Sequence, residues 1–402
     1  MGQQPHESPG PLAGLRVLEL GQLIAGPFAT RILADFGAEV IKVEPRQGDP
    51  LRTWGMPTAA GSLWSLTQSR NKKCVTLDLK RAKAHDLVRR LAARCDMVVE
   101  NFRPGKMEEW GLGYEDLKAG NPGLIMVRIS GYGQTGPYRD RPGFGNIAES
   151  MGGIRYITGY PDRPPVRVGL SLGDTLAALY AVAGALAALE HRHITGAGQV
   201  VDVALSEAVL SVLEGIIPDY GRYGAVRERT GNVLANAAPS NMYRAADGRW
   251  VAIGANADGI FRRFTALMGR PELAGDPRFI DNPARVAHVH ELDAIIGDWV
   301  ATQTTEELLR RLEKAEVPAG PVYSVADIAA DPQFQARNML LQVFDSRVGT
   351  LLMPGVVPAL TETPGGVRWA GPDIGQHNDE VYGRLLGLGE AERDQLKREG
   401  VI

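Results

Sequence analysis

One aspartate stands where a carboxylate could act as a nucleophile. Asp174 lies between Gly173 and Thr175, just before an Ala-rich apolar run that is typical of a helix, and the pattern predicts that this helix begins after Asp174. Aspartate is a favoured N-cap because its carboxylate accepts bonds from free backbone N–H groups and complements the helix dipole, and this structural role explains the residue on spacing alone. The same surroundings favour the ionised carboxylate, which can attack an acyl carbon and form a covalent intermediate.

A glycine-rich stretch partly matches a dinucleotide-binding signature. Gly131–Gly136 has the spacing G-x-G-x-x-G and follows a segment with strand character. A phosphate-binding loop of this kind needs a helix at its end, so that backbone N–H groups point at the pyrophosphate. Pro137 and Pro142 bracket a polar loop there instead. We therefore interpret the stretch as a turn, which argues against a nicotinamide-dependent enzyme.

A second motif has the spacing of a serine nucleophile elbow. Gly169–Gly173 reads G-x-S-x-G around Ser171, and histidines follow at His288, His290 and His377. An elbow turns sharply from a buried strand into a helix at the serine. The preceding residues, Arg163–Val168, make a poor buried strand, and the predicted helix begins three residues late. We interpret Ser171 as a loop serine, and a serine hydrolase stays a minor alternative.

Basic side chains gather near two predicted strands. Arg70–Lys73 and Lys80 flank one strand, and Arg103 follows another. Cations at the carboxyl ends of parallel strands can bind phosphates, although a solvated basic face is the simpler interpretation. The seven histidines and the cysteines Cys74 and Cys95 have no metal-ligand spacing and form no disulfide framework. We expect no metal site, and a reducing, cytoplasmic environment.

The charge balance excludes proteins that bind nucleic acid through bulk positive charge. The 402 residues include 44 Lys and Arg against 47 Asp and Glu, a formal net charge of −3. Hydrophobic residues make up 44% of the chain, as in ordinary folded proteins, and the length predicts two or three domains. The longest apolar run, Leu176–Leu189, is shorter than the roughly 18 residues of a membrane span, so we predict a buried core helix and no membrane association.

Strands alternate with helices in the first half of the chain, which predicts an α/β fold with a parallel sheet. The helices are expected around Phe28–Phe36, at 81–93, near Glu115 and in the Ala-rich run. The strands are expected at 15–20, 39–44, 75–79, 97–102, 124–130 and 199–205.

The pattern changes in the second half. Met242–Arg244 and Trp250–Ile253 flank an Asp-Gly turn and predict a hairpin, and mostly helical sequence follows to about Asp331. We predict a large α/β domain from residues 12–210 and 340–402, and a smaller α+β domain at 225–330 inserted between them. Residues 211–224 and 331–339 are expected to be linkers, and 1–11 a flexible tail. The last stretch is too small to be a domain alone, so it is expected to pack on the α/β unit.

Several motifs in register over the chain point to one family. They are PLAGLRVLEL, IAGPFATRILADFGAEVIKVEP, GDPLRTWG, RNKK, VENFRPG, ISGYGQTGPY and the LGD around Asp174. The sequence resembles the class III CoA transferases, the superfamily that contains formyl-CoA transferase, carnitine CoA transferase and alpha-methylacyl-CoA racemase. This resemblance implies a Rossmann-like large domain formed by both chain ends, an inserted smaller domain and a dimer of two interlocked subunits.

The resemblance also implies a mechanism. Asp174 would attack the donor thioester to give an acyl-aspartyl anhydride, and the released CoA thiolate would convert this into an aspartyl-CoA thioester. Coenzyme A enters as an acyl-CoA substrate, and no permanently bound cofactor or metal is implied. By similarity, CoA is expected to contact Ile24, Ala25, Arg46, Leu77, Leu79, Lys80, Asn101, Phe102, Arg103, Phe144 and Gly145.

Departures from the family patterns narrow the substrate. Formyl-CoA transferase has a glutamine where this chain has Ile24, and an arginine where it has Pro45, which argues against oxalate and formyl-CoA. The sequence is most similar to succinyl-CoA-dependent transferases of small dicarboxylates such as malate and citramalate. A second acceptor carboxylate needs a cation, and the candidates are Arg46, Arg167 and Arg222.

Two alternatives within the family stay open. Because some relatives work as hetero-oligomers of two similar chains, this chain could be a non-catalytic or partner-dependent CoA-binding subunit; the resemblance otherwise implies a homodimer. An acyl-CoA racemase is disfavoured, because racemases carry a catalytic histidine where this chain has Gly143–Asn146, and two-base epimerisation then lacks one partner.

Overall fold

The computed structural model describes residues 9–402, and most of the predicted tail, residues 1–8, lies outside the described part. The chain forms two compact units. Unit 1 combines the residues up to 154 with 168–217 and 333–402, and unit 2 combines 155–167 with 218–332. Helices α9 (Ile216–Tyr223) and α15 (Pro332–Ala336) cross the boundaries between them.

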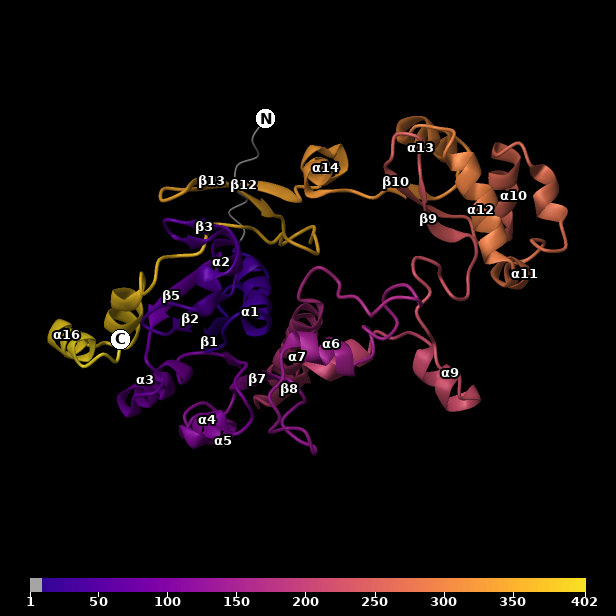
Figure 1. Ribbon diagram of the computed structural model, residues 1–402. Coiled ribbons are helices and arrows are strands. Elements are labelled where there is room, and N and C mark those ends of the chain that lie inside the picture. Colours follow the sequence, from indigo (N-terminus) through magenta and orange to yellow (C-terminus); the bar gives the residue numbers. More distant parts are fainter. Residues whose placement is uncertain (1–8) are drawn as a thin grey trace. The chain divides into compact units, whose positions relative to one another are not determined.

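Unit 1 is built on a six-stranded sheet with the order β5-β2-β1-β6-β7-β8 (Figure 1). Every neighbouring pair of strands is parallel, which confirms the α/β prediction. The expected strands are all present, and the one expected at 39–44 begins and ends at the predicted residues. The strands are β1 (Arg16–Glu19), β2 (Glu39–Glu44), β5 (Lys72–Thr76), β6 (Met97–Glu100), β7 (Ile125–Ser130) and β8 (Val200–Ala204).

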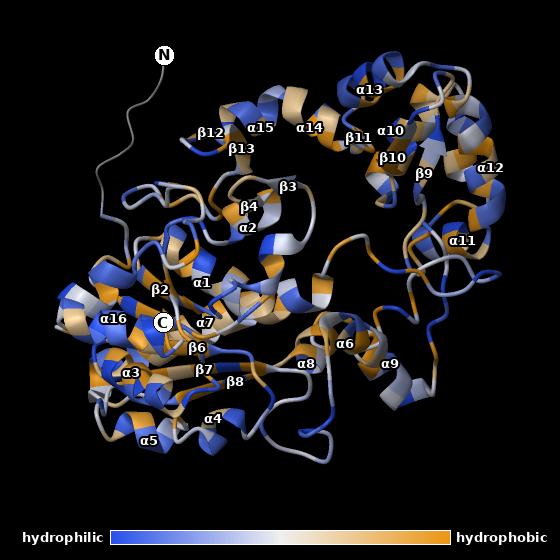
Figure 2. Cartoon of the chain, turned by 60° about the vertical axis from the view of Figure 1, so that its left-hand side comes forward, coloured by the Kyte–Doolittle hydropathy of each residue, from blue (hydrophilic) through white to orange (hydrophobic). Residues whose placement is uncertain are grey.

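Helices cover both faces of this sheet (Figure 2). Apolar side chains of the strands pack there against those of the helices. On one face α1 (Ala25–Asp35) and α7 (Leu172–Thr195) pack together over the strands. On the other, α3 (Ala82–Ala92) shares a core with the C-terminal π-helix η3 (Asp379–Leu385) and α16 (Glu390–Arg398). This confirms that the end of the chain packs on the α/β unit. Tyr382 of η3, for example, donates a hydrogen bond to the carbonyl oxygen of Thr76 (2.8 Å).

The remaining elements of unit 1 are short. The helices are η1 (Pro50–Thr53), α2 (Leu63–Gln68), α4 (Lys106–Glu109), α5 (Tyr114–Lys118), α6 (Gly145–Met151) and α8 (Leu205–Leu210). The strands form two hairpins, β3 (Pro57–Thr58) with β4 (Gly61–Ser62), and β12 (Leu340–Asp345) with β13 (Gly349–Pro354).

Unit 2 contains the predicted hairpin, β9 (Ser240–Arg244) and β10 (Trp250–Gly254), which pair antiparallel. A third strand, β11 (Ala319–Pro321), pairs with β10 and escapes prediction because three residues of the type Ala-Gly-Pro carry no alternation. Helices fill the stretch between them, as expected. They are α10 (Asp258–Leu267), η2 (Pro271–Gly275), α11 (Asn282–Ala287), α12 (Val289–Val300), α13 (Thr305–Lys314) and, after β11, α14 (Val325–Ala330).

Helix α7 differs from the prediction in two respects: it is longer than its apolar run, and it begins before Asp174 instead of after it. It spans 24 residues, and among the helices of residues 9–402 it alone is long and apolar enough to cross a membrane by length and composition. A third of its most apolar window is buried, through a stripe of small residues that includes Ala177, Ala181 and Ala185. The helix also begins at Leu172, so that Asp174 is its third residue and Ser171 takes the N-cap position.

The basic segment Arg70–Lys73 is neither a solvated face nor a phosphate site. Strand β5 begins at Lys72, three residues earlier than expected, so the segment lies at the amino end of the strand, away from the edge where α/β sheets bind ligands. Arg70 and Lys72 are fully buried. Arg70 pairs with Asp35 (2.7 Å) and Lys72 with Glu19 (2.8 Å), so carboxylates from distant segments neutralise them.

Candidate active site

Most of the predicted CoA-binding residues follow the carboxyl ends of the parallel strands. They therefore share one edge of the sheet. They are Ile24 and Ala25 after β1, Arg46 after β2, Leu77, Leu79 and Lys80 after β5, and Asn101, Phe102 and Arg103 after β6. The order of the strands reverses between β1 and β6, because the chain extends the sheet to β2 and β5 on one side and to β7 and β8 on the other. Open α/β sheets bind ligands at such a switch point.

The side chain of Asn101 joins the two strands at this point. Its Oδ1 accepts a hydrogen bond from the backbone N–H of Gln22 and its Nδ2 donates one to the carbonyl oxygen of Gln22, both at 2.9 Å. A methyl group on Gly21 would lie 3.1 Å from Asn101 Oδ1, so the backbone approaches closely. Asn101 thus holds the turn after β1, a role that the sequence did not indicate.

Exposed cations line the same edge. Arg46, Lys80 and Arg103 are exposed, as phosphate-binding side chains must be. Arg81, which was not predicted, is a fourth exposed cation at this edge. It follows β5 and Arg46 follows β2, and the guanidinium groups of both approach Gly400. The position of Arg81 directly after Lys80 was the available signal. Leu77, by contrast, is buried in the core, so only its backbone is available to a ligand.

Asp174 lies against Gly145. Helix α6 begins at Gly145 and α7 at Leu172, and a methyl group on Gly145 would lie 2.8 Å from Cγ of Asp174 and overlap its Oδ2. The buried Glu149 accepts a bond from the N–H of Gly173 (3.2 Å), which ties α6 to the first turn of α7. The predicted pair Phe144 and Gly145 is therefore brought next to the predicted nucleophile, and the missing side chain of Gly145 makes room for the carboxylate itself.

Comparison with known proteins decides the family. The sequence model described as CoA-transferase family III matches residues 12–378. The chain belongs to this family. It is 54% identical to a succinyl-CoA–D-citramalate CoA-transferase of Chloroflexus aurantiacus over 98% of both chains. It is 44% identical to the beta subunit of a succinyl-CoA–L-malate CoA-transferase of the same organism, again over 98% of both. A solved CAIB/BAIF family protein from Brucella suis superposes with a TM-score of 0.84 at 37% identity, covering 94% of this chain and 99% of that one.

The family III assignment confirms the resemblance found in the sequence and makes this chain a CoA transferase, an enzyme whose substrates are CoA thioesters. The carboxyl edge of the sheet, with its exposed cations, and the carboxylate of Asp174 in the first turn of α7 are the two places that the site predictions single out. Within residues 9–402, no group of three or more His, Cys, Asp and Glu is arranged to hold a metal ion.

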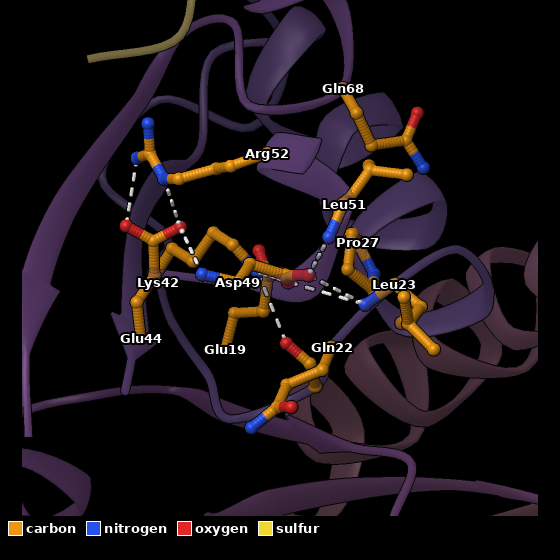
Figure 3. A network of polar contacts seen from close by, with 12 residues as sticks. Glu19, Gln22, Leu23, Pro27, Lys42, Glu44, Asp49, Leu51, Arg52 and Gln68 are labelled. Carbon is orange, nitrogen blue, oxygen red and sulfur yellow. Dashed lines mark hydrogen bonds and ion pairs between the residues drawn. The ribbon is translucent and has the colours of Figure 1, made fainter. Parts of the chain in front are cut away.

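A network of buried charges lies beneath the turn that connects β1 to α1 (Figure 3). Lys42 contacts Glu19 and Asp49, each at 2.8 Å. Burial opposes all three charges, but mutual attraction outweighs it, so that the pKa of Lys42 is raised and those of Glu19 and Asp49 are lowered. Beside them Arg52 pairs with Glu44 at 2.8 Å. These residues lie within the motifs that carry the family resemblance, but their types and spacing alone predict no role for them.

Glu100 anchors the other strand of the switch point. Burial, only partly offset by Arg128, raises its pKa to about 7. Its Oε2 accepts a bond from the N–H of Phe102 (2.7 Å), and the Phe102 ring packs edge-on against Trp110. The residues that follow β6 are thus held by a carboxylate at the end of that strand.

The serine-elbow interpretation gains no support. No strand leads directly into Ser171, because the element before α7 is the helix α6. Ser171 caps α7 through its backbone, and the ring of His377 accepts a bond from the N–H of Cys74 (3.2 Å). His288 and His290 belong to unit 2. Of the arginines considered for the acceptor, Arg46 lies on the carboxyl edge in unit 1, whereas Arg167 and Arg222 belong to unit 2.

Proposed function

We propose that this enzyme transfers CoA from succinyl-CoA to a small dicarboxylate of the malate or citramalate type. The names of its relatives support this donor and these acceptors, the 54% identical enzyme being a D-citramalate transferase and the 44% identical chain a subunit of an L-malate transferase. The 38% identical succinate–glutarate CoA-transferase of Agrobacterium fabrum also uses dicarboxylates by its name. Arg46, Arg167 and Arg222 are the candidates for binding the second acceptor carboxylate.

The proposed chemistry is two linked acyl exchanges on Asp174. Its carboxylate attacks the thioester carbon of succinyl-CoA and the C–S bond breaks. The products are a mixed anhydride of succinate with Asp174 and free CoA thiolate. The thiolate then attacks the aspartyl carbonyl, which releases succinate and forms an aspartyl-CoA thioester. The acceptor carboxylate attacks this thioester, which releases CoA thiolate and forms a second anhydride between the acceptor and Asp174. The thiolate then attacks the acceptor carbonyl of this anhydride, giving the acceptor's CoA thioester and regenerating the Asp174 carboxylate. Splitting one difficult exchange into such steps is the purpose of covalent catalysis.

One observation carries the proposal: the carboxylate of Asp174 stands in the first turn of α7 beside a residue without a side chain. The helix dipole favours its ionised form, which is the nucleophile. The candidates for contact with CoA stay the residues implied by the family resemblance. They are Ile24, Ala25, Arg46, Leu77, Leu79, Lys80, Asn101, Phe102, Arg103, Phe144 and Gly145. The exposed cations among them suit the phosphates of CoA.

The test is the mass of the intact protein after brief incubation with succinyl-CoA. We expect an acyl or CoA adduct that peptide mapping places on Asp174 and that Asp174→Ala lacks. The matched control is Asp202→Ala, which should keep the adduct. Asp202 lies in β8, and its carboxylate accepts a hydrogen bond from the backbone N–H of Gln134. An adduct that survives Asp174→Ala, or transfer without Asp174, would sink the mechanism.

A partner-dependent subunit is the second candidate, because two relatives are named as alpha and beta subunits, at 43% and 44% identity. We favour a cytoplasmic homodimer, for which the exposed Leu179, Tyr180 and Leu186 of α7 offer an apolar face. Light scattering and activity of the purified chain separate the two. A chain that transfers CoA only after a second, similar chain is added would establish the hetero-oligomer.

A further inference from the structure

The turn between β1 and α1, residues 21–24, is held by side chains from four other segments. Each of its residues has a backbone group bound to one of them, although the turn itself has no regular structure. Lys42 Nζ donates to the oxygen of Gly21 (3.1 Å), and Gln68 Nε2 donates to the oxygen of Ile24 (3.2 Å). Asn101 bonds to both backbone groups of Gln22 (2.9 Å). The carboxylate of Asp49 accepts a hydrogen bond from the N–H of Leu23 (3.1 and 3.2 Å).

The conformation of this turn is one that the chain would not choose alone. Leu23 has φ +64°, in the left-handed region that side chains other than those of Gly, Asn and Asp rarely adopt. Such a residue persists only where its surroundings hold it. Asp49 does so directly, since both of its carboxylate oxygens accept the N–H of Leu23, and its Oδ1 also caps η1 through the N–H of Leu51 (Figure 3).

Asp49 is in turn fixed by buried charge. Lys42 lies between Asp49 and Glu19, and Glu19 also pairs with Lys72, all at 2.8 Å. All four side chains are at most 3% exposed, and their charges sum to zero. Replacing one carboxylate by an amide therefore leaves an uncompensated cation directly below the turn.

We propose that Asp49, held by Lys42, is a positioning residue for the acyl-CoA substrate, because it keeps residues 21–24 in the shape that contacts CoA. The inference rests on the proposed function in one respect, the contact of Ile24 and Ala25 with CoA. Asp49 acts through the turn and not on the reacting atoms. Its removal should therefore weaken binding of CoA itself as well as catalysis.

The experiment compares Asp49→Asn with Asp35→Asn. Asp35 is also a buried carboxylate, paired with Arg70 (2.7 Å) and bound by Asn71 (2.8 Å), but at the amino end of the sheet. Both variants should lose stability in urea. Only Asp49→Asn should raise the Kd of CoA, measured by calorimetry, and the KM of succinyl-CoA, with kcat/KM falling about 10²-fold, the effect of a misplacement of about 1 Å. The KM of Asp35→Asn should stay near that of the wild type.

Two further variants keep the test readable if Asp49→Asn does not fold. Gln68→Met removes the bond to Ile24 without changing buried charge, while Phe28 N still donates to the Ile24 oxygen (2.7 Å), so it should fold and raise the Kd of CoA. Leu23→Gly should restore part of the lost affinity in the Asp49→Asn background, because glycine adopts positive φ without steric cost. A purely structural role for Asp49 predicts no such rescue.

Each outcome bears on the inference. Equal losses of CoA affinity in Asp49→Asn and Asp35→Asn would overturn it, as would unchanged affinity in both Asp49→Asn and Gln68→Met. A wild type that binds no CoA would overturn it too. If the wild type binds CoA but forms no adduct on Asp174, the proposed mechanism fails, and selective loss of CoA binding in Asp49→Asn still supports the positioning role.

Discussion

Replacing Gly145 by alanine tests whether space beside Asp174 is needed for catalysis. The added methyl group would lie 2.8 Å from Cγ of Asp174, whereas carbon atoms in ordinary contact are about 3.5–4.0 Å apart. The carboxylate must therefore move or rotate by about 1 Å. A displacement of this size costs about 10²-fold in rate, which is about 2.7 kcal/mol of transition-state stabilisation.

Stability should respond far less to the same change. Gly145 is the first residue of α6 and does not have positive φ, and alanine is favoured over glycine in a helix by about 1 kcal/mol, which offsets part of the crowding. The assay pairs steady-state transfer from succinyl-CoA with urea unfolding. Gly259→Ala is the matched control, since Gly259 also lies in the first turn of a helix and a methyl group there meets nothing closer than 4.0 Å.

The pattern expected for Gly145→Ala is a large fall in kcat with a midpoint of unfolding close to that of the wild type. A variant that keeps wild-type kcat and still forms the adduct would refute the reasoning, because the carboxylate would then not need the room that the glycine provides. Equal losses of activity in Gly145→Ala and Gly259→Ala would show a general effect of the substitution.

Three other outcomes follow from buried groups. The pKa of Glu100 rises from 4.5 to about 7 on folding, so the folded state binds more protons between these values and this group's contribution to stability falls as pH rises through them, by on the order of 3 kcal/mol; urea unfolding from pH 5 to 8 should show a flatter profile for Glu100→Gln, and identical slopes would contradict this. Burial raises the pKa of the Cys74 thiol, and that of Cys95 to about 12, so the native protein should react with no thiol reagent at pH 8 and with two equivalents in denaturant. Asp35→Asn should cost about 3 kcal/mol in unfolding free energy, because Arg70 stays buried without its carboxylate; a loss under 1 kcal/mol would argue against the pair.

Local patterns in the sequence predicted the elements whose residues alternate or repeat regularly. The strand at 39–44 has the predicted bounds, and the β9–β10 hairpin was marked by its Asp247-Gly248 turn. The start of β5 was missed because Lys72 and Lys73 are charged, and nothing nearby in the sequence says that Glu19 and Glu39 neutralise them. Pairs that form across more than thirty residues depend on the fold, not on the local pattern.

The same distinction applies to the site. Asp174 was found from its sequence surroundings, but its place as the third residue of α7 depends on where the loop from Val168 to Ser171 enters the helix. The proximity of Gly145 to Asp174 follows from the packing of α6 on α7, which no spacing encodes. Resemblance to the family supplied the candidate CoA-binding residues, whereas the structure supplied the groups that hold several of them.

Strand geometry explains why the charges under the turn occur where they do. Side chains alternate along a strand, so Glu19, Lys42 and Lys72 point to the face covered by α1, while Leu18, Ile41 and Val75 pack on the opposite face. The parallel register sets Glu19 opposite Lys42, and Thr30 of α1 donates a bond to Glu19 (2.6 Å). A one-residue slip of β2 would turn Lys42 to the apolar face and leave it unpaired, so the charges also select the register. The register and the proposed substrate site are thereby linked, because the lysine that fixes the pairing of β1 with β2 also holds the turn that follows β1.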